Sequence, residues 1–113
     1  MQIYRTYGKP PLTVAVIHGG PGTIGEMEPV ARDLSADLGV LEPIQTETTL
    51  EGQIEELKIT LEEQASPPVT LIGFSWGAWL SYIFTARYPA LVKKLILVGS
   101  GPYEQQYVSF SFR

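Results

Sequence analysis

One serine of this chain lies in a pattern that suits a nucleophile. Gly73-Phe-Ser-Trp-Gly77 has the spacing G-x-S-x-G, a buried-type strand precedes it, and a helical pattern follows it. A tight turn of this kind projects a serine hydroxyl above a sheet, and Gly73 and Gly77 let strand and helix pass closely. We therefore expect Ser75 to be a nucleophile. The backbone N–H of Trp76, at the positive end of the helix, would stabilise an oxyanion.

A plainer interpretation of the same residues also exists. Ser75 could be an ordinary N-cap, with the two glycines serving a tight strand-to-helix turn. The spacing alone occurs by chance, but its position between a strand and a helix favours the nucleophile.

A second glycine-rich segment follows the first strong strand. His18-Gly19-Gly20-Pro21-Gly22 begins directly after residues 12–17, a continuous β-branched run typical of a buried strand. Glycines let a backbone approach a reacting carbonyl, and proline stiffens the turn. We expect Gly20 to supply a second oxyanion N–H.

The same loop permits a different reading. Gly20-x-Gly22-x-x-Gly25 matches a dinucleotide fingerprint, with Glu42 placed to bind a ribose. Two residues separate the strand from the first fingerprint glycine, and this reading leaves Ser75 without a role, so we rank it lower. A turn that binds nothing is the third alternative.

The chain's single histidine, His18, is a tempting catalytic base. Its position immediately after a strand instead favours a loop-organising role, with its ring bonded to nearby backbone.

Around these motifs, short β-rich runs alternate with helical patterns. This order predicts a single α/β domain of three layers, in which a mostly parallel sheet of about four or five strands carries helices on both faces. Gly39 should end the first helix and Pro43 should close the second strand. Residues 99–102 should form a loop, and no period is visible after residue 102. The expected strands are 12–17, 40–42, 69–72 and 94–98, with a short edge strand at 2–4, and the expected helices are about 26–38, 50–64 and 76–88.

Composition excludes several classes of protein. The 113 residues include no cysteine, 44% are hydrophobic and 18% are charged, which fits a globular chain without disulfides or thiolate chemistry. The longest apolar runs are too short to span a bilayer, and no secretion signal is visible, so we expect a cytoplasmic protein. The net charge of −4 and the absence of any basic cluster larger than Lys93-Lys94 argue against nucleic acid. No metal-ligand cluster or cofactor requirement is apparent.

Taken together, the motifs resemble part of a known family. His18–Gly22, Gly73–Gly77, residues 86–89 and residues 92–99 are similar to the N-terminal half of an α/β-hydrolase, closest to the proline iminopeptidase-like branch. The resemblance implies that Ser75 hydrolyses an ester or amide of a small molecule through an acyl-enzyme, with the N–H groups of Gly20 and Trp76 as the oxyanion hole. Phe74 departs from the usual glycine beside the nucleophile.

The resemblance also shows what this sequence lacks. In that fold the acid and the histidine follow the serine, yet no histidine follows Ser75, and Glu104 is the one carboxylate side chain available as an acid. A solvated loop glutamate is the simpler interpretation of Glu104. We therefore expect a truncated hydrolase fold without cap or C-terminal part, weakly active or inactive alone.

Two alternatives follow for function and assembly. A non-catalytic scaffold or interaction module could keep the fold without the chemistry, and a dinucleotide-binding domain is the third choice. The helix 76–88 is apolar nearly all round, and the last strand would leave an open edge. We therefore expect a homo-oligomer or a complementing second chain.

Overall fold

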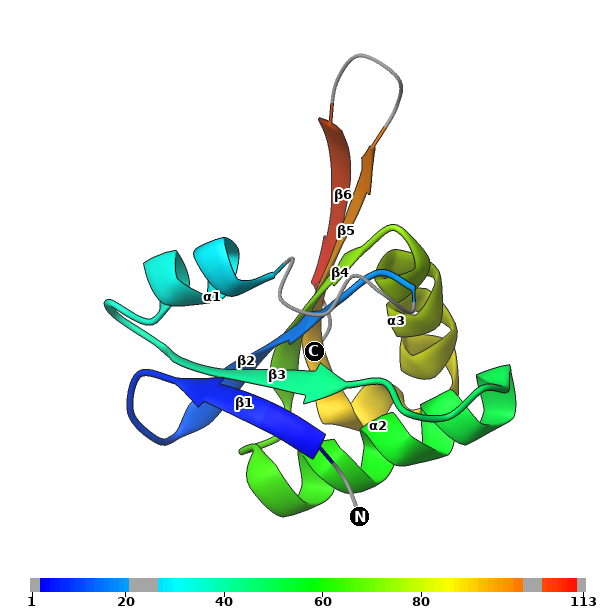
Figure 1. The fold of residues 1–113 in the computed structure, drawn as a ribbon, viewed down its shortest axis with the longest axis horizontal. Helices are drawn as coiled ribbons and strands as arrows, with labels where there is room; N and C mark the ends of the chain where they lie inside the picture. Colours follow the sequence, from blue (N-terminus) through cyan, green and yellow to red (C-terminus); the bar gives the residue numbers. More distant parts are fainter. Residues whose placement is uncertain (1–2, 21–26, 101–104, 112–113) are drawn as a thin grey trace.

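The strands and helices alternate along the chain, as Figure 1 shows. The computed structural model describes residues 3–20, 27–100 and 105–111. The elements are β1 (Ile3–Tyr7), β2 (Leu12–Ile17), α1 (Glu28–Leu34), β3 (Gly39–Ile44), α2 (Leu50–Gln64), β4 (Val69–Phe74), α3 (Trp76–Arg87), a 3₁₀ turn (Pro89–Leu91), β5 (Val92–Ser100) and β6 (Gln105–Ser111).

All of these strands join one sheet in the order β1-β3-β2-β4-β5-β6. The four central strands are parallel, and the outer strands β1 and β6 pair antiparallel with β3 and β5. The predicted mostly parallel sheet is therefore confirmed. It has six strands in the described part of the chain rather than four or five, because β6 pairs antiparallel with β5 beyond the strands that were predicted.

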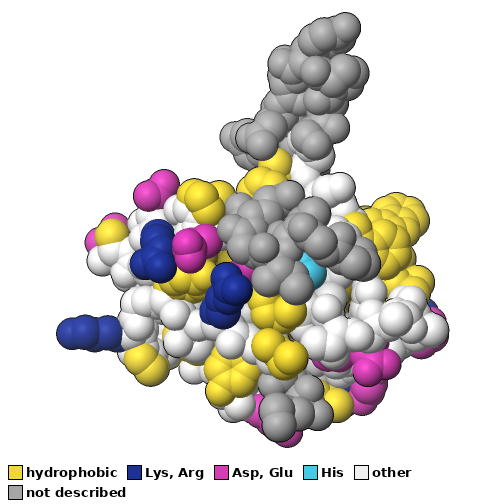
Figure 2. All heavy atoms as spheres, viewed as in Figure 1, with side chains coloured by type: hydrophobic (Ala, Val, Ile, Leu, Met, Phe, Trp, Pro, Cys, Tyr) yellow, Lys and Arg dark blue, Asp and Glu magenta, His cyan; other side chains and the backbone are white. Residues whose placement is uncertain are grey.

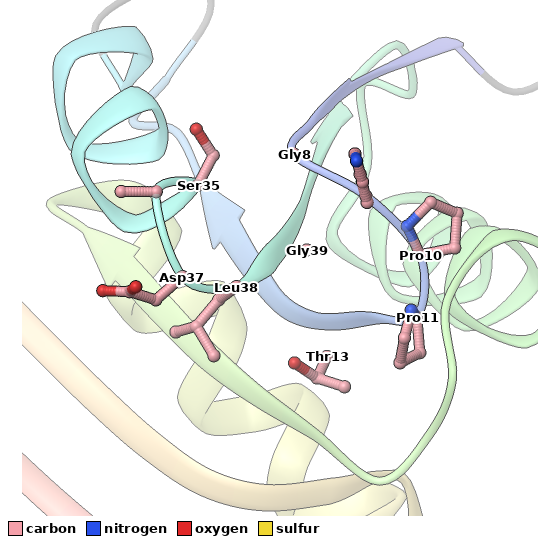
Figure 3. Close-up of a pocket in the computed structure, with 10 residues that line it drawn as sticks. Gly8, Pro10, Pro11, Thr13, Ser35, Asp37, Leu38 and Gly39 are labelled. Atoms are coloured by element: carbon pink, nitrogen blue, oxygen red, sulfur yellow. The ribbon is translucent and has the colours of Figure 1, made fainter.

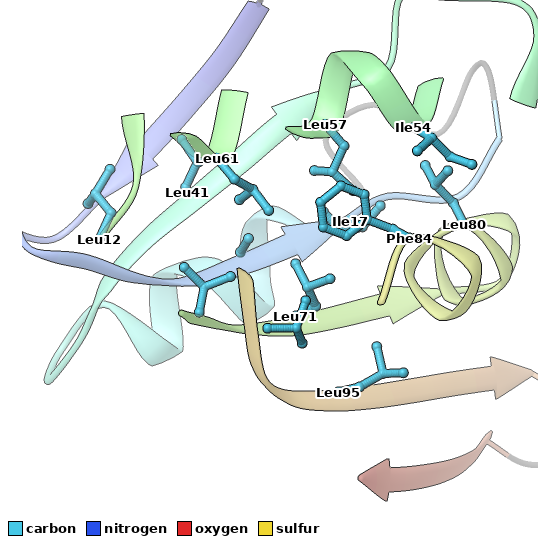
Figure 4. Packing of buried hydrophobic residues seen from close by; sticks show 13 residues of the cluster. Leu12, Ile17, Leu41, Ile54, Leu57, Leu61, Leu71, Leu80, Phe84 and Leu95 are labelled. Carbon is cyan, nitrogen blue, oxygen red and sulfur yellow. The ribbon is translucent and has the colours of Figure 1, made fainter. Parts of the chain in front are cut away.

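Two hydrophobic clusters cover the two faces of the sheet, which confirms the predicted three layers. The larger cluster packs α2 and α3 on one face (Figure 4). The smaller cluster packs α1 on the other face, where β2 contributes the alternate residues Val14 and Val16. The larger cluster comprises Leu12, Ala15, Ile17, Leu41, Ile54, Leu57, Leu61, Val69, Leu71, Leu80, Phe84, Val92 and Leu95, and the smaller comprises Val14, Val16, Met27, Ala31, Val40 and Ile72.

The helix α2 has the bounds predicted from its apolar stripe. Thr49 caps its start by accepting a hydrogen bond from the backbone N–H of Gly52 at 3.0 Å. Ile54, Leu57 and Leu61 face the sheet, as their spacing predicts.

The first helix and the strand after it differ from the prediction. The helix α1 ends at Leu34 and not at Leu38, because residues 35–37 form a turn in which the Ser35 hydroxyl donates to the Arg32 carbonyl at 2.8 Å. Gly39 does not end a helix but begins β3, where it pairs with Leu12. Pro43 does not close β3 either. The pairing with β2 ends at Leu41, so the missing N–H of Pro43 leaves no bond of that ladder unmade.

The C-terminal tail was expected to lack regular structure, and this expectation was wrong. Residues 105–111 form β6, and β5 extends through Gly99 and Ser100, where a loop was predicted. The two strands pair from Lys94 with Ser111 to Ser100 with Gln105. Their hairpin projects beyond the rest of the sheet in Figure 1. The predicted edge strand at 2–4 is also longer, because β1 spans residues 3–7.

Within the described residues, every helix is too short or too polar to cross a membrane.

Candidate active site

Ser75 occupies a single-residue turn between β4 and α3. Its φ of 56° and ψ of −118° lie in a region that L-residues rarely adopt, and the residue is exposed. The backbone N–H of Ser75 donates to the Val98 carbonyl on β5 at 3.0 Å, and its own carbonyl accepts from the N–H of Ala78 at 3.0 Å. The turn is therefore held from both sides, in a conformation that costs about 1–3 kcal/mol elsewhere in proteins.

The two glycines of this turn sit where no side chain fits. A methyl group on Gly73 would lie 2.7 Å from the Ala78 Cα, and one on Gly77 would lie 2.5 Å from the His18 carbonyl oxygen and 2.8 Å from the Ile17 carbonyl carbon. These neighbours are backbone atoms, which have little freedom to move. The contacts of Gly77 bring the start of α3 against the end of β2. The segment containing Ser75 and the segment beginning at His18 are therefore adjacent, as a shared oxyanion hole requires.

His18 is buried, with 1% of its surface exposed, and both ring nitrogens are bonded to backbone. Its Nδ1 lies 2.8 Å from the Gly19 carbonyl oxygen, and its Nε2 accepts the backbone N–H of Gln45 at 3.0 Å. Because Nε2 accepts, Nδ1 carries the proton and donates to Gly19. Neither nitrogen is left to take a proton from Ser75.

Two glutamines that were not predicted as site residues bind the segments that contain His18 and Trp76. The Gln45 side-chain amide donates to the His18 carbonyl at 2.8 Å, and the Trp76 indole N–H donates to Gln53 Oε1 at 2.7 Å. Gln53 is 7% exposed. One signal could have revealed it: a polar residue on the apolar stripe of α2, three positions after Leu50 and four before Leu57.

Glu42, which the dinucleotide-binding hypothesis assigns to a ribose, lies inside the protein. It is fully buried in β3, and its Oε1 accepts the Tyr7 hydroxyl at 2.9 Å. Burial, together with the neighbouring Glu42 carboxylate, raises the pKa of the Tyr7 hydroxyl above its ordinary value. Glu42 thus pairs β1 with β3 and does not face a loop where a nucleotide could reach it.

The remaining candidates are only partly covered by the structure. Gly20 is half-buried, and a methyl group placed on it would meet no atom of the described residues within 4 Å. Pro21, Gly22, Gly25 and Glu104 lie outside the described residues.

A surface ion pair joins α2 to α3 on the side away from the sheet. The Arg87 guanidinium donates two hydrogen bonds to the Glu51 carboxylate, at 2.5 and 2.7 Å. This hydrogen bonding holds the pKa of Glu51 below its ordinary value and raises the pKa of Arg87.

A cavity of about 570 Å³ lies far from Ser75 along the strands (Figure 3). Its lining includes Gly8, Pro11, Ser35 and Leu38, which precede the amino ends of β2 and β3. Ser75 follows the carboxyl end of the parallel strand β4, so this cavity lies at the opposite ends of the parallel strands. It therefore has no part in the chemistry of Ser75. No cluster of three or more potential metal ligands occurs in residues 3–20, 27–100 and 105–111.

Comparisons with known proteins agree with this arrangement. No family model matches the sequence. The chain is 32% identical over 54 residues to ethanol acetyltransferase 1 of Cyberlindnera jadinii, covering 48% of this chain and 16% of that protein. A marine microorganism esterase superposes with a TM-score of 0.76 at 26% identity, covering 85% of this chain and 40% of that structure. An alpha/beta hydrolase from Novosphingobium aromaticivorans superposes with a TM-score of 0.74 at 21% identity, covering 89% and 40%.

The sheet order, the helices on both faces and these superpositions define the class: the chain has the α/β-hydrolase fold. It spans about 40% of the length of these solved structures and 16% of the acetyltransferase.

Proposed function

We propose that this chain carries the nucleophile and the oxyanion hole of a serine hydrolase that cleaves an ester or amide of a small molecule. The observation that carries the proposal is the backbone of Ser75, which has a φ of 56° and is exposed at the start of α3. A protein maintains such strain where the surroundings over-determine it, most often at functional sites.

In this reaction the Ser75 Oγ attacks the substrate carbonyl carbon and its proton passes to a base. The carbonyl oxygen becomes an oxyanion, which the N–H groups of Trp76 and Gly20 would stabilise. The leaving alcohol or amine takes a proton as its bond to carbon breaks. Water then cleaves the acyl-enzyme and regenerates the serine hydroxyl. Each of these steps proceeds without a metal or an organic cofactor.

The base is the missing part. His18 is the chain's one histidine, and both of its ring nitrogens are bonded to backbone. We propose that a further polypeptide segment or a second chain supplies the histidine and the acid, with Glu104 a remaining candidate for the acid. Alone, the chain should be weakly active or inactive, because an unassisted serine is a poor nucleophile at neutral pH. The resemblance of the motifs at His18 and Ser75 supports, as part of this proposal, a hydrolase of the proline iminopeptidase-like branch.

A fluorophosphonate probe tests this proposal. The Ser75 Oγ would form a bond to phosphorus as fluoride leaves and the hydroxyl proton passes to solvent. We expect slow labelling that disappears in Ser75→Ala and persists in Ser66→Ala, which changes an exposed serine on the loop before β4. Equal labelling of the two variants would contradict a special role for Ser75.

A second candidate function, a self-associating interaction module, is favoured by the outer face of α3. Trp79 and Tyr82 are 56% and 49% exposed, and their rings stack with centroids 6.2 Å apart. Figure 2 shows hydrophobic side chains gathered over this helix. Light scattering across micromolar concentrations would show oligomers, and Trp79→Lys should shift them toward monomer. A clean monomer at every concentration would contradict self-association.

A further inference from the structure

One loop and the start of one helix touch both segments of the proposed oxyanion hole. Gln45, the first residue after β3, donates its backbone N–H to the His18 ring and its side-chain amide to the His18 carbonyl, at 3.0 and 2.8 Å. Gln53, in the first turns of α2, accepts the indole N–H of Trp76 at 2.7 Å. His18 precedes one proposed oxyanion donor, Gly20, and Trp76 carries the other.

The orientation of the Gln53 amide is determined by its partners. An indole N–H can only donate and a backbone carbonyl can only accept. Gln53 therefore presents Oε1 to Trp76, while its Nε2 donates to the Glu47 carbonyl at 2.9 Å. Both ends of the amide are engaged, so the indole is fixed to the backbone of the loop and not merely to a free side chain.

The loop is itself fastened to α2 at two further points. The Glu56 carboxylate accepts both the backbone N–H and the hydroxyl of Thr46, and the Thr49 hydroxyl caps the helix at the Gly52 N–H. Residues 45–56 thus form one frame, which we call the glutamine frame. The two glutamines of this frame lie among mainly apolar side chains: Gln45 and Gln53 line a cavity of about 10 Å³ together with Ile17, Leu57 and Leu80. Hydrogen bonds in such surroundings are stronger than in water.

We propose that Gln53 is a positioning residue of the oxyanion hole. By holding the Trp76 indole to the frame that also holds His18, it sets the distance between the Trp76 N–H and the Gly20 segment. The inference rests on the proposed function, since it assigns a purpose to that site. Gln53 itself does not touch the substrate.

The test compares Gln53→Leu with Gln64→Leu in the full chain. Gln64 ends the same helix, about 16 Å further along it at 1.5 Å per residue, so this variant controls for the loss of one amide from α2. The first measurement is the rate of Ser75 labelling by the fluorophosphonate, corrected for the folded fraction. We expect Gln53→Leu to slow it about tenfold to a hundredfold, and Gln64→Leu to leave it unchanged.

A structural role alone would lower stability and leave the labelling rate of folded molecules within about twofold of the original, and that result would overturn the proposal. Trp76→Phe keeps an aromatic side chain, although a smaller one, and removes the indole N–H donor, so it should slow labelling by a similar factor. Combined with Gln53→Leu, it should add little further loss, because each substitution removes the same bond. Fully additive losses would also overturn the proposal.

A second measurement separates this inference from the proposed function. In the original chain the Trp76 indole N–H should exchange slowly with solvent, whereas that of the exposed Trp79 should exchange fast. Gln53→Leu should speed exchange at Trp76 and shift the resonance of its backbone amide. If the original chain is not labelled at all, the proposed function fails. The positioning role is then tested by the backbone amide resonance of Trp76 alone: a shift in Gln53→Leu supports it, and an unchanged resonance contradicts it.

Discussion

The two turns that meet at the proposed oxyanion hole are held in different ways. The Ser75 turn (Gly73–Gly77) is fixed by its own backbone: two glycines pass within contact distance of other main-chain atoms, and the chain moves from strand to helix in one residue. The His18 turn (His18–Gly20) is fixed by side chains, through an imidazole and the amide of Gln45.

The two turns should therefore be sensitive to different kinds of substitution. Backbone contact leaves no room for a larger residue, so the Ser75 turn should tolerate almost no added volume at its glycines. Side-chain hydrogen bonds leave room, so the His18 turn should tolerate volume at Gly20 but not the loss of a partner. Substitutions in the two turns should therefore differ in their effect on stability.

The largest effect should come from Gly77→Val. Its side chain would overlap the carbonyl groups of Ile17, at the end of β2, and of His18, the next residue; these are backbone atoms with little freedom to move. We expect the free energy of unfolding to fall by about 3 kcal/mol or more, measured by urea denaturation. Gly20→Ala is the control in the other turn, and should change stability by less than about 0.5 kcal/mol because no atom of the described residues lies within 4 Å of the added methyl group. Similar losses in the two variants would remove the contrast.

The next effect should come from His18→Ala. The substitution leaves the partly buried N–H of Gln45 without its acceptor and opens a space where the buried His18 ring lay, at the end of β2. We expect a loss of about 2 kcal/mol of unfolding free energy. His18→Gln offers an oxygen to the same N–H and should recover part of this loss. If His18→Ala lowers the free energy of unfolding no more than Gly20→Ala does, side chains do not hold this turn.

A gain in stability should follow from Ser75→Gly. Glycine adopts a φ of 56° without strain, although it loses more chain entropy on folding. The net effect should be about 1 kcal/mol of added stability, seen as a higher urea midpoint. Ser75→Ala keeps the Cβ and the strain, so it should remain close to the original chain. Equal stability of the two variants would mean that the turn stores no strain.

The contrast also explains which parts were predictable from the sequence. The start of α3 at Trp76 follows from five consecutive residues, because a tight turn and a helix constrain one another locally. The preceding strand β4 ends at Phe74, two residues later than predicted. The bonds from Gln45 to His18 and from Trp76 to Gln53 join residues 27 and 23 positions apart. Their meeting depends on β3 lying beside β2 and on α2 packing near α3, which no local pattern contains.

The same reasoning covers the errors in the fold. The strand β6 was missed although Val108-Ser109-Phe110-Ser111 alternates apolar and polar residues, because this signal is only four residues long. Its pairing with β5 completes the strand. The helix α1 was predicted too long, because Leu38 fits a helical spacing although it lies beyond the turn that ends the helix. The spacing of apolar residues indicates a helix, but it does not indicate where a hydrogen-bonded turn ends that helix.

The smallest effect should appear at the Glu51–Arg87 pair, which joins α2, the helix of the glutamine frame, to α3, the helix that follows Ser75. The hydrogen bond to Arg87 depresses the pKa of Glu51 in the folded state. Its contribution is therefore fully present above the pKa of Glu51 in the unfolded chain, and is lost as the pH falls through the lower folded value. Arg87→Gln should be slightly less stable than the original chain at neutral pH, and the difference should vanish in strong acid. Both groups are exposed, so salt should also reduce the difference. A difference that persists in acid would mean that Arg87 acts through packing, and the two turns would then be coupled by α3 itself and not by charge.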